Sequence, residues 1–122
     1  MRVREATPEE RAAVLNVLDG AMLATERVRD RIEAGDVLVA LSENGERVLG
    51  ALVLDSNHIE AIAVRRRRRG QGIGTTLVEA AAERRERLIA EFDADVCPFY
   101  EQLGFSIEPA EPDRRFRGEY HP

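Results

Sequence analysis

The first third of the chain changes from a short extended run to helical spacing. Residues 2–5 predict a strand. The sequence then offers an N-cap residue, a proline and a carboxylate in the order that starts a helix, Thr7-Pro8-Glu9-Glu10. Apolar residues at helical spacing give this helix one hydrophobic face, formed by Val14, Leu15, Leu18 and Met22. A second, more polar helix is predicted over residues 25–34, ending at Gly35.

The middle of the chain has the short apolar runs of an antiparallel sheet. Residues 37–41 and 48–54 flank Asn44-Gly45, a pair typical of a tight hairpin turn. A third strand is predicted over residues 58–64, after a second cluster of turn residues. These three strands should form a meander.

The last half of the chain alternates helices with strands. A glycine-rich loop at residues 70–74 opens a helix whose apolar face contains Ile73, Leu77, Val78 and Ala81. The strand predicted over residues 88–92 should run parallel to residues 58–64, because strand, helix and strand form a right-handed crossover. A short helix at 99–103 and strands at 105–107 and 115–117 complete an α/β (α+β) fold. Its sheet is mixed and mostly antiparallel, flanked by helices, within one domain spanning residues 1–122.

Composition narrows the class of protein. At 122 residues, 43% hydrophobic and 34% charged, the chain is expected to be globular, and it has no apolar run of membrane-spanning length or signal-peptide type. We therefore expect a cytoplasmic protein with no membrane partner. The only cysteine, Cys97, and two distant histidines provide no pattern for a metal site.

Every one of the 18 cationic side chains is arginine, although the net charge is −5. Either a GC-rich genome or the high-salt cytosol of a haloarchaeon would produce this composition. The acidic balance argues against a nucleic-acid partner. Residues 65–69, five consecutive arginines, are the exception, and they directly precede the glycine-rich loop.

That loop has the properties of an anion-binding site. Gly70, Gly72 and Gly74 lack Cβ atoms, so a ligand can approach the backbone where the first helical turn has free N–H groups. A phosphate group is the expected ligand. A dinucleotide-binding loop is excluded because its pattern requires glycine at position 75, which is Thr75 in this sequence. The other common nucleotide-binding loop is excluded because no Gly-Lys-Ser/Thr motif is present.

Two separated motifs resemble the GNAT superfamily of acetyl-CoA-dependent N-acetyltransferases. The first is Arg69-Gly70-Gln71-Gly72-Ile73-Gly74, after a strand that ends in Val64. The second is Phe99-Tyr100-Glu101-Gln102-Leu103-Gly104-Phe105. The resemblance covers nearly the whole chain, since the order of predicted elements is also that of the family.

The resemblance implies a binding mode for acetyl-CoA. The two central parallel strands are expected to splay apart, with the pantetheine arm in the gap and the diphosphate on the loop amides. The residues so implied are Ile62, Ala63, Val64, Arg69, Gly70, Gln71, Gly72, Ile73, Gly74 and Thr75. Asp93 stands where the family often has an asparagine that bonds the pantetheine, and it lacks the amide donors.

The resemblance also implies transfer of an acetyl group to an amine of a small molecule or peptide. Tyr100 occupies the position of the general acid, and a backbone N–H near Ile62 or Ala63 would stabilise the oxyanion. Glu60 and His58 are both candidates for the general base, with ordered water as another. Strand alternation predicts that both lie on the same face as Ile62 and Val64.

Two other function classes stay open at this stage. A non-catalytic acyl-CoA-binding module would keep the glycine-rich loop without turnover. An arginine-rich nucleic-acid accessory protein would instead use residues 65–69. The acceptor amine has no signature in the sequence, and a homodimer is compatible with it.

Overall fold

A computed structural model describes residues 1–18, 25–111 and 114–122 of the chain. The strands are β1 (Arg2–Glu5), β2 (Val37–Leu41), β3 (Val48–Asp55), β4 (His58–Val64), β5 (Leu88–Asp93), β6 (Ser106–Ala110) and β7 (Arg115–Tyr120). The α-helices are α1 (Arg11–Val17), α2 (Thr25–Glu33), α3 (Ile73–Ala82) and α4 (Cys97–Gln102). Short 3₁₀ helices lie at Pro8–Glu10, Arg66–Arg68 and Ala94–Val96.

The strands form one mixed sheet in the order β1-β2-β3-β4-β5-β7-β6. All neighbours are antiparallel except β4 and β5, so the predicted parallel pair is confirmed. The predicted meander of β2, β3 and β4 is confirmed as well. The last strand, β7, lies between β5 and β6, a position that the local sequence pattern did not indicate.

The predicted start of the first helix is confirmed. The side chain of Glu10 accepts a hydrogen bond from the backbone N–H of Thr7 at 2.9 Å, which completes a capping box. Val14 and Leu18 of the predicted apolar face are buried, while Met22 lies outside the described residues.

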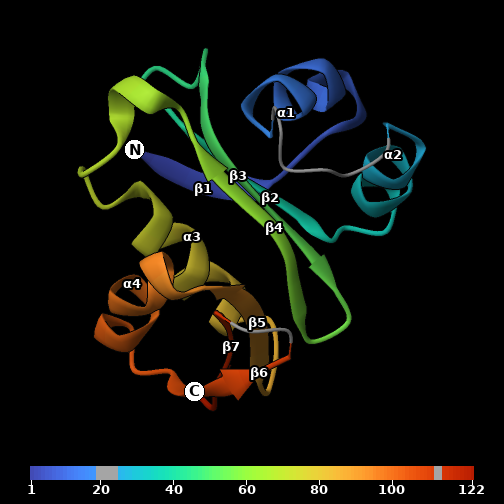
Figure 1. Cartoon of the computed structure of the whole chain (residues 1–122). Coiled ribbons are helices and arrows are strands. Elements are labelled where there is room, and N and C mark those ends of the chain that lie inside the picture. Colours follow the sequence, from blue (N-terminus) through green and yellow to red (C-terminus); the bar gives the residue numbers. More distant parts are fainter. Residues whose placement is uncertain (19–24, 112–113) are drawn as a thin grey trace.

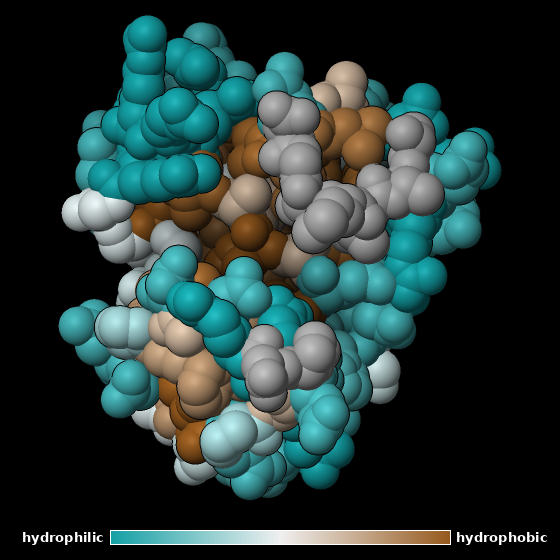
Figure 2. Space-filling model, viewed as in Figure 1, coloured by the Kyte–Doolittle hydropathy of each residue, from teal (hydrophilic) through white to brown (hydrophobic). Residues whose placement is uncertain are grey.

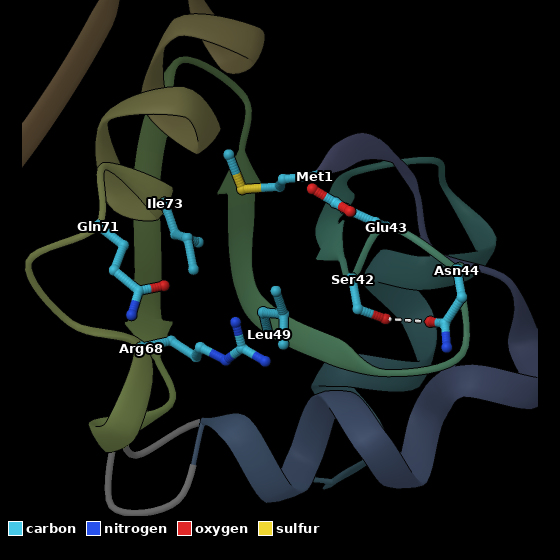
Figure 3. Close-up of a pocket in the computed structure, with 8 residues that line it drawn as sticks. All are labelled: Met1, Ser42, Glu43, Asn44, Leu49, Arg68, Gln71 and Ile73. Atoms are coloured by element: carbon cyan, nitrogen blue, oxygen red, sulfur yellow. Dashed lines mark hydrogen bonds between the residues drawn. The ribbon is translucent and has the colours of Figure 1, made fainter.

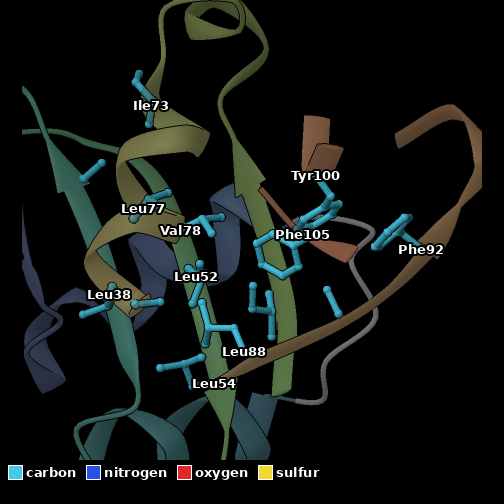
Figure 4. Packing of buried hydrophobic residues seen from close by; sticks show 14 of the residues in the cluster. Leu38, Leu52, Leu54, Ile73, Leu77, Val78, Leu88, Phe92, Tyr100 and Phe105 are labelled. Atoms are coloured by element: carbon cyan, nitrogen blue, oxygen red, sulfur yellow. The ribbon is translucent and has the colours of Figure 1, made fainter. Parts of the chain in front are cut away.

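Helices cover both faces of the sheet (Figure 1). On one face, α1 and α2 bury Val14, Val17, Val28 and Ile32 against β2 and β3. On the other face, α3 and α4 cover a second cluster, shown in Figure 4, that includes Leu38, Leu52, Leu77, Leu88, Phe92 and Phe105. Alternate residues of β3 face the two clusters, as the period of a strand requires. None of the helices in the described part of the chain has the length and apolarity needed to cross a lipid bilayer.

The sheet opens between β4 and β5. These strands share a single residue pair, His58 with Ile89, next to a 2.8 Å hydrogen bond from the Ile89 N–H to the Asn57 carbonyl. Beyond that pair the strands diverge, as Figure 4 shows. The space-filling view has a hollow at its centre, between the part with α1, α2 and β1–β4 and the part with α4 and β5–β7, and hydrophobic residues form its floor (Figure 2). The expected splay of the central parallel strands is confirmed.

A β-bulge at Glu60 changes which side chains share a face of β4. Val53 pairs with Ala61 and Leu54 pairs with Ile59, so Glu60 has no partner in β3. Ile62 packs in the cluster beneath α3, whereas the Glu60 carboxylate contacts arginines of α2 on the opposite face. His58 pairs with Asp55, whose carboxylate also contacts these arginines. The prediction that Glu60 and His58 share a face with Ile62 and Val64 is therefore wrong, because simple alternation does not count the extra residue.

Candidate active site

The edge of β4 that faces the gap has unpaired backbone groups. The N–H of Arg65 donates to the Leu49 carbonyl at 2.9 Å, so residues at odd positions here direct their backbone groups toward β3. Ala63, paired with Ala51, belongs to that set. Ile62 and Val64 belong to the other set and direct their N–H and C=O groups into the gap. Of the two residues predicted as oxyanion donors, Ile62 directs its N–H into the gap and Ala63 directs its N–H toward β3.

The glycine-rich loop directs a row of amides toward the same region. Gly70 and Gly72 have φ angles of +80° and +82°, and nothing lies within 4 Å of where a Cβ would stand on either. No carbonyl in the described part of the chain accepts from the N–H groups of residues 70–75. The next amide, that of Thr76, is satisfied by the Gly72 carbonyl at 3.0 Å. The loop and the first turn of α3 therefore offer consecutive free donors at the positive end of a helix dipole.

The third glycine of the motif lies next to Phe99. A Cβ on Gly74 would be in ordinary van der Waals contact with the Phe99 ring, at 3.4 Å. Both residues line a cavity of about 310 Å³, together with Val64, Arg68, Arg69, Gly70, Gly72, Ile73 and Thr75. This cavity joins the end of β4 to the free amides. The structure thus brings most of the predicted cofactor-binding residues together.

The five arginines at residues 65–69 differ in the hydrogen bonds that their side chains make. Arg65 Nε donates to the Val48 carbonyl at 2.6 Å, and Arg69 Nε donates to the Val64 carbonyl at 3.3 Å. Arg68 lines the loop cavity and also a separate cavity of about 510 Å³ that borders Ser42, Asn44 and Gln71 (Figure 3). Arg68 and Arg69 both line the loop cavity, and of these two only Arg68 makes no side-chain hydrogen bond with the described residues.

Tyr100 lies in an aromatic cluster on the α3 and α4 face of the gap (Figure 4). Its ring stacks on Phe92 of β5 with centroids 4.3 Å apart, and it makes edge contacts with Phe99 and Phe105. The side chain is buried, and this burial raises the pKa of the Tyr100 phenol to about 12. The hydroxyl makes no hydrogen bond with residues 1–18, 25–111 or 114–122. The phenol therefore keeps its proton at neutral pH.

The raised pKa of Tyr100 predicts a loss of stability in alkali. The folded chain keeps the phenol proton between about pH 10 and about pH 12, whereas the unfolded chain releases it, so the free energy of unfolding falls as pH rises through this window. At about pH 11 the expected loss is about 1 kcal/mol. Urea denaturation of wild type and Tyr100→Phe at about pH 8 and about pH 11 measures it. An equal alkaline loss in both proteins would contradict the prediction.

The two candidate bases have different surroundings. Glu60 is mostly buried, and its Oε2 accepts a hydrogen bond from Arg27 Nε at 2.6 Å. That hydrogen bond, with the charge of the carboxylate, raises the pKa of the Arg27 guanidinium above its usual value. His58 is exposed at the start of β4, opposite Asp55. Glu60 and Tyr100 thus approach the gap from opposite faces of the sheet.

Neither Asp93 nor Cys97 lines the cavity beside the free amides. Asp93 ends β5, is largely exposed and pairs with Arg115 of β7 at 3.1 Å. Cys97 begins α4, is partly buried and packs against the cluster beneath α3. The arginines of α2 that contact Glu60 were not identified from the sequence. The available signal was that Arg27 and Arg31 are one helical turn apart, next to the buried Val28 and Ile32.

The family of the protein follows from a comparison over almost its whole length. A family model described as "Acetyltransferase (GNAT) domain" matches residues 4–119. The chain belongs to the GNAT acetyltransferase family. No curated protein matches the sequence.

Solved GNAT structures share the fold at low sequence identity. Rv2747 from Mycobacterium tuberculosis, in complex with CoA, has a TM-score of 0.81 at 15% identity, with 100% of this chain and 99% of that chain covered. A GNAT acetyltransferase from Listeria monocytogenes has a TM-score of 0.77 at 15% identity, covering 99% and 94%. An agmatine N-acetyltransferase has a TM-score of 0.78 at 14% identity, covering 99% of each chain. The GNAT fold predicted from the two motifs is therefore confirmed.

Proposed function

We propose that this GNAT protein transfers the acetyl group of acetyl-CoA to a primary amine. The observation that carries the proposal is the row of free amides at residues 70–75, directly beside the gap between β4 and β5. Backbone N–H groups and a helix N-terminus suit a diphosphate. The empty space around Gly70 and Gly72 leaves room for it. The residues present therefore fit the acyl donor that the GNAT family uses.

The edge of β4 supplies the complementary contacts for the pantetheine arm. The N–H and C=O groups of Ile62 and the N–H of Val64 face the gap without a partner there, whereas the Val64 carbonyl accepts a hydrogen bond from Arg69 Nε. An amide-containing chain can pair with such an edge as another strand would. This contact would place the thioester beside the Ile62 N–H, which is the proposed donor to the developing oxyanion.

Acid and base groups then act from the two faces of the sheet. In the reaction the amine nitrogen forms a bond to the acetyl carbon and the carbon–sulfur bond breaks. Tyr100, whose buried phenol carries its proton at neutral pH, donates that proton to the departing sulfur. Glu60 or His58 accepts one proton of the acceptor ammonium before attack, directly or through water. The nitrogen loses a second proton as the amide forms, and this proton restores the Tyr100 phenol through solvent. Glu60 is favoured by its place at the point where β4 leaves β5.

Two measurements test the proposed function. Acetyl-CoA should raise the melting temperature of the protein in a concentration-dependent manner, because only the folded chain has the amides in place. Release of free thiol should then depend on both the protein and an added amine. A panel of amino acids, polyamines, aminoglycosides and peptides would supply the acceptors.

Each alternative predicts a different result in the same experiments. Stabilisation by acetyl-CoA without thiol release for any amine would indicate a non-catalytic binding module. No response to acetyl-CoA, with salt-sensitive retention of RNA or DNA, would indicate an arginine-rich accessory protein. Either result would overturn the acetyltransferase proposal.

A further inference from the structure

Four charged side chains form a compact cluster where α2 crosses the end of the β3–β4 hairpin. Arg27 bonds Glu60 at 2.6 Å and contacts Asp55 at 3.2 Å. Arg31, one helical turn later, contacts Asp55 at 3.1 Å and Glu60 at 3.4 Å. Two guanidinium groups and two carboxylates thus balance each other. The formal charge of the cluster is zero.

The hydrogen bonds within this cluster are incomplete. Arg31 Nε and Glu60 Oε1 face each other at 3.4 Å, and both atoms are buried without a hydrogen bond. The Nη1 atoms of Arg27 and Arg31 have no acceptor in the described part of the chain. Arg27 also has a side chain that is 46% exposed. The cluster therefore retains donors for an anion and an acceptor for a cation.

The cluster lies beside the proposed reaction centre. Glu60 follows directly after the point where β4 leaves β5, and Ile62, the proposed oxyanion donor, is two residues further along the strand, about 7 Å away. The proposed acid, Tyr100, is on the opposite face of the sheet. An acceptor that reaches the thioester from the α2 face must therefore pass these arginines.

Charge balance in the cluster restricts which amine can bind. At neutral pH an aliphatic amine arrives as an ammonium ion, and Glu60 is the group that it would pair with. Arg27 and Arg31 then share the Glu60 carboxylate with another cation. A partly buried guanidinium whose charge is not fully balanced is unfavourable in free energy. A carboxylate on the acceptor would restore the charge balance, because guanidinium groups make bidentate hydrogen bonds to carboxylates.

We propose that Arg27 and Arg31 recognise a carboxylate on the acceptor, so that the substrate is an amino acid or another amino-carboxylate. This inference rests on the proposed acetyltransferase activity and names its acceptor class. A simple alkylamine would leave the arginines short of negative charge. A polyamine would add further positive charge beside them and should be disfavoured most.

Paired substrates test the inference. Each straight-chain amino acid with a terminal amine is compared with the alkylamine of the same length, because the two differ in the carboxylate and little in amine pKa. For wild type, kcat/KM from thiol release should favour the amino acid by about tenfold or more. Arg27→Gln and Arg31→Gln should each reduce this preference to about threefold or less, mainly through KM for the amino acid. Arg27→Lys should restore part of it.

Arg29→Gln is the matched control. Arg29 is on the same helix, is exposed, and forms no ion pair with the described residues. It should retain the wild-type preference, and circular dichroism should show that all four variants are folded. Equal kcat/KM for acid and alkylamine, or a preference that survives in Arg27→Gln and Arg31→Gln, would overturn this inference alone. No thiol release with any amine would overturn the proposed function, and this inference with it.

Discussion

Gly72→Val should weaken acetyl-CoA binding by about a hundredfold or more. Gly72 has a φ of +82°, which valine adopts only with strain, so the loop must move away from its present course. Its new Cβ would also stand in the open space assigned to the diphosphate. Losing two charge-assisted hydrogen bonds at about 1.5 kcal/mol each corresponds to about this factor. Isothermal titration calorimetry with acetyl-CoA measures the effect.

Gly45→Val is the matched control for the strain at Gly72. Gly45 has a φ of +75° in the β2–β3 turn and lines neither of the two cavities that border the loop. The same change there should lower the melting temperature but leave acetyl-CoA affinity unaltered. Wild-type affinity in Gly72→Val would mean that the loop amides do not hold the diphosphate. The binding mode proposed for the acyl donor would then be wrong.

Tyr100→Phe should lower kcat by about a hundredfold while acetyl-CoA affinity stays nearly unchanged. Phenylalanine preserves the stacking on Phe92 and the edge contacts with Phe99 and Phe105, so the cluster should remain packed. What is lost is the neutral phenol that would protonate the departing thiolate. Single-turnover thiol release measures the chemical step directly.

Tyr120→Phe tests whether loss of a tyrosine hydroxyl has a general effect. Tyr120 stacks on Phe105 with centroids 5.3 Å apart, at the end of β7. The Tyr120→Phe variant should keep the wild-type single-turnover rate. If the single-turnover rate of Tyr100→Phe also equals that of wild type, Tyr100 is not the general acid and another group or solvent supplies the proton.

Local patterns in the sequence were sufficient to predict most elements of the fold. The capping box at Thr7 and Glu10 and the Asn44-Gly45 turn are defined by residues close in the chain, so their physics is visible without tertiary structure. The place of β7 between β5 and β6 is different. It depends on pairing between residues far apart in sequence, which short-range periodicity does not encode.

The candidate site likewise contains residues that local sequence predicts and residues that depend on tertiary packing. The loop amides follow from three glycines and a helix start, all within six residues, so the sequence was enough to predict a row of free donors there. The face of Glu60 was predicted wrongly, because one extra residue in β4 reverses the side on which later residues lie. The partners of Glu60 on α2 could not be predicted either, since they depend on that bulge and on the packing of α2.

Strands β4 and β5 share a single residue pair, His58 with Ile89, so the sheet has two portions, β1–β4 and β5–β7. The side chains beneath α3 provide most of the contact between these portions. A ligand that hydrogen-bonds along β4 and fills the space toward β5 would add a second connection between these portions. Its binding free energy would then count toward the stability of the whole chain, by RT ln(1 + [L]/Kd). With acetyl-CoA as the proposed ligand, the lifetime of this protein against proteolysis would consequently rise with the acetyl-CoA concentration.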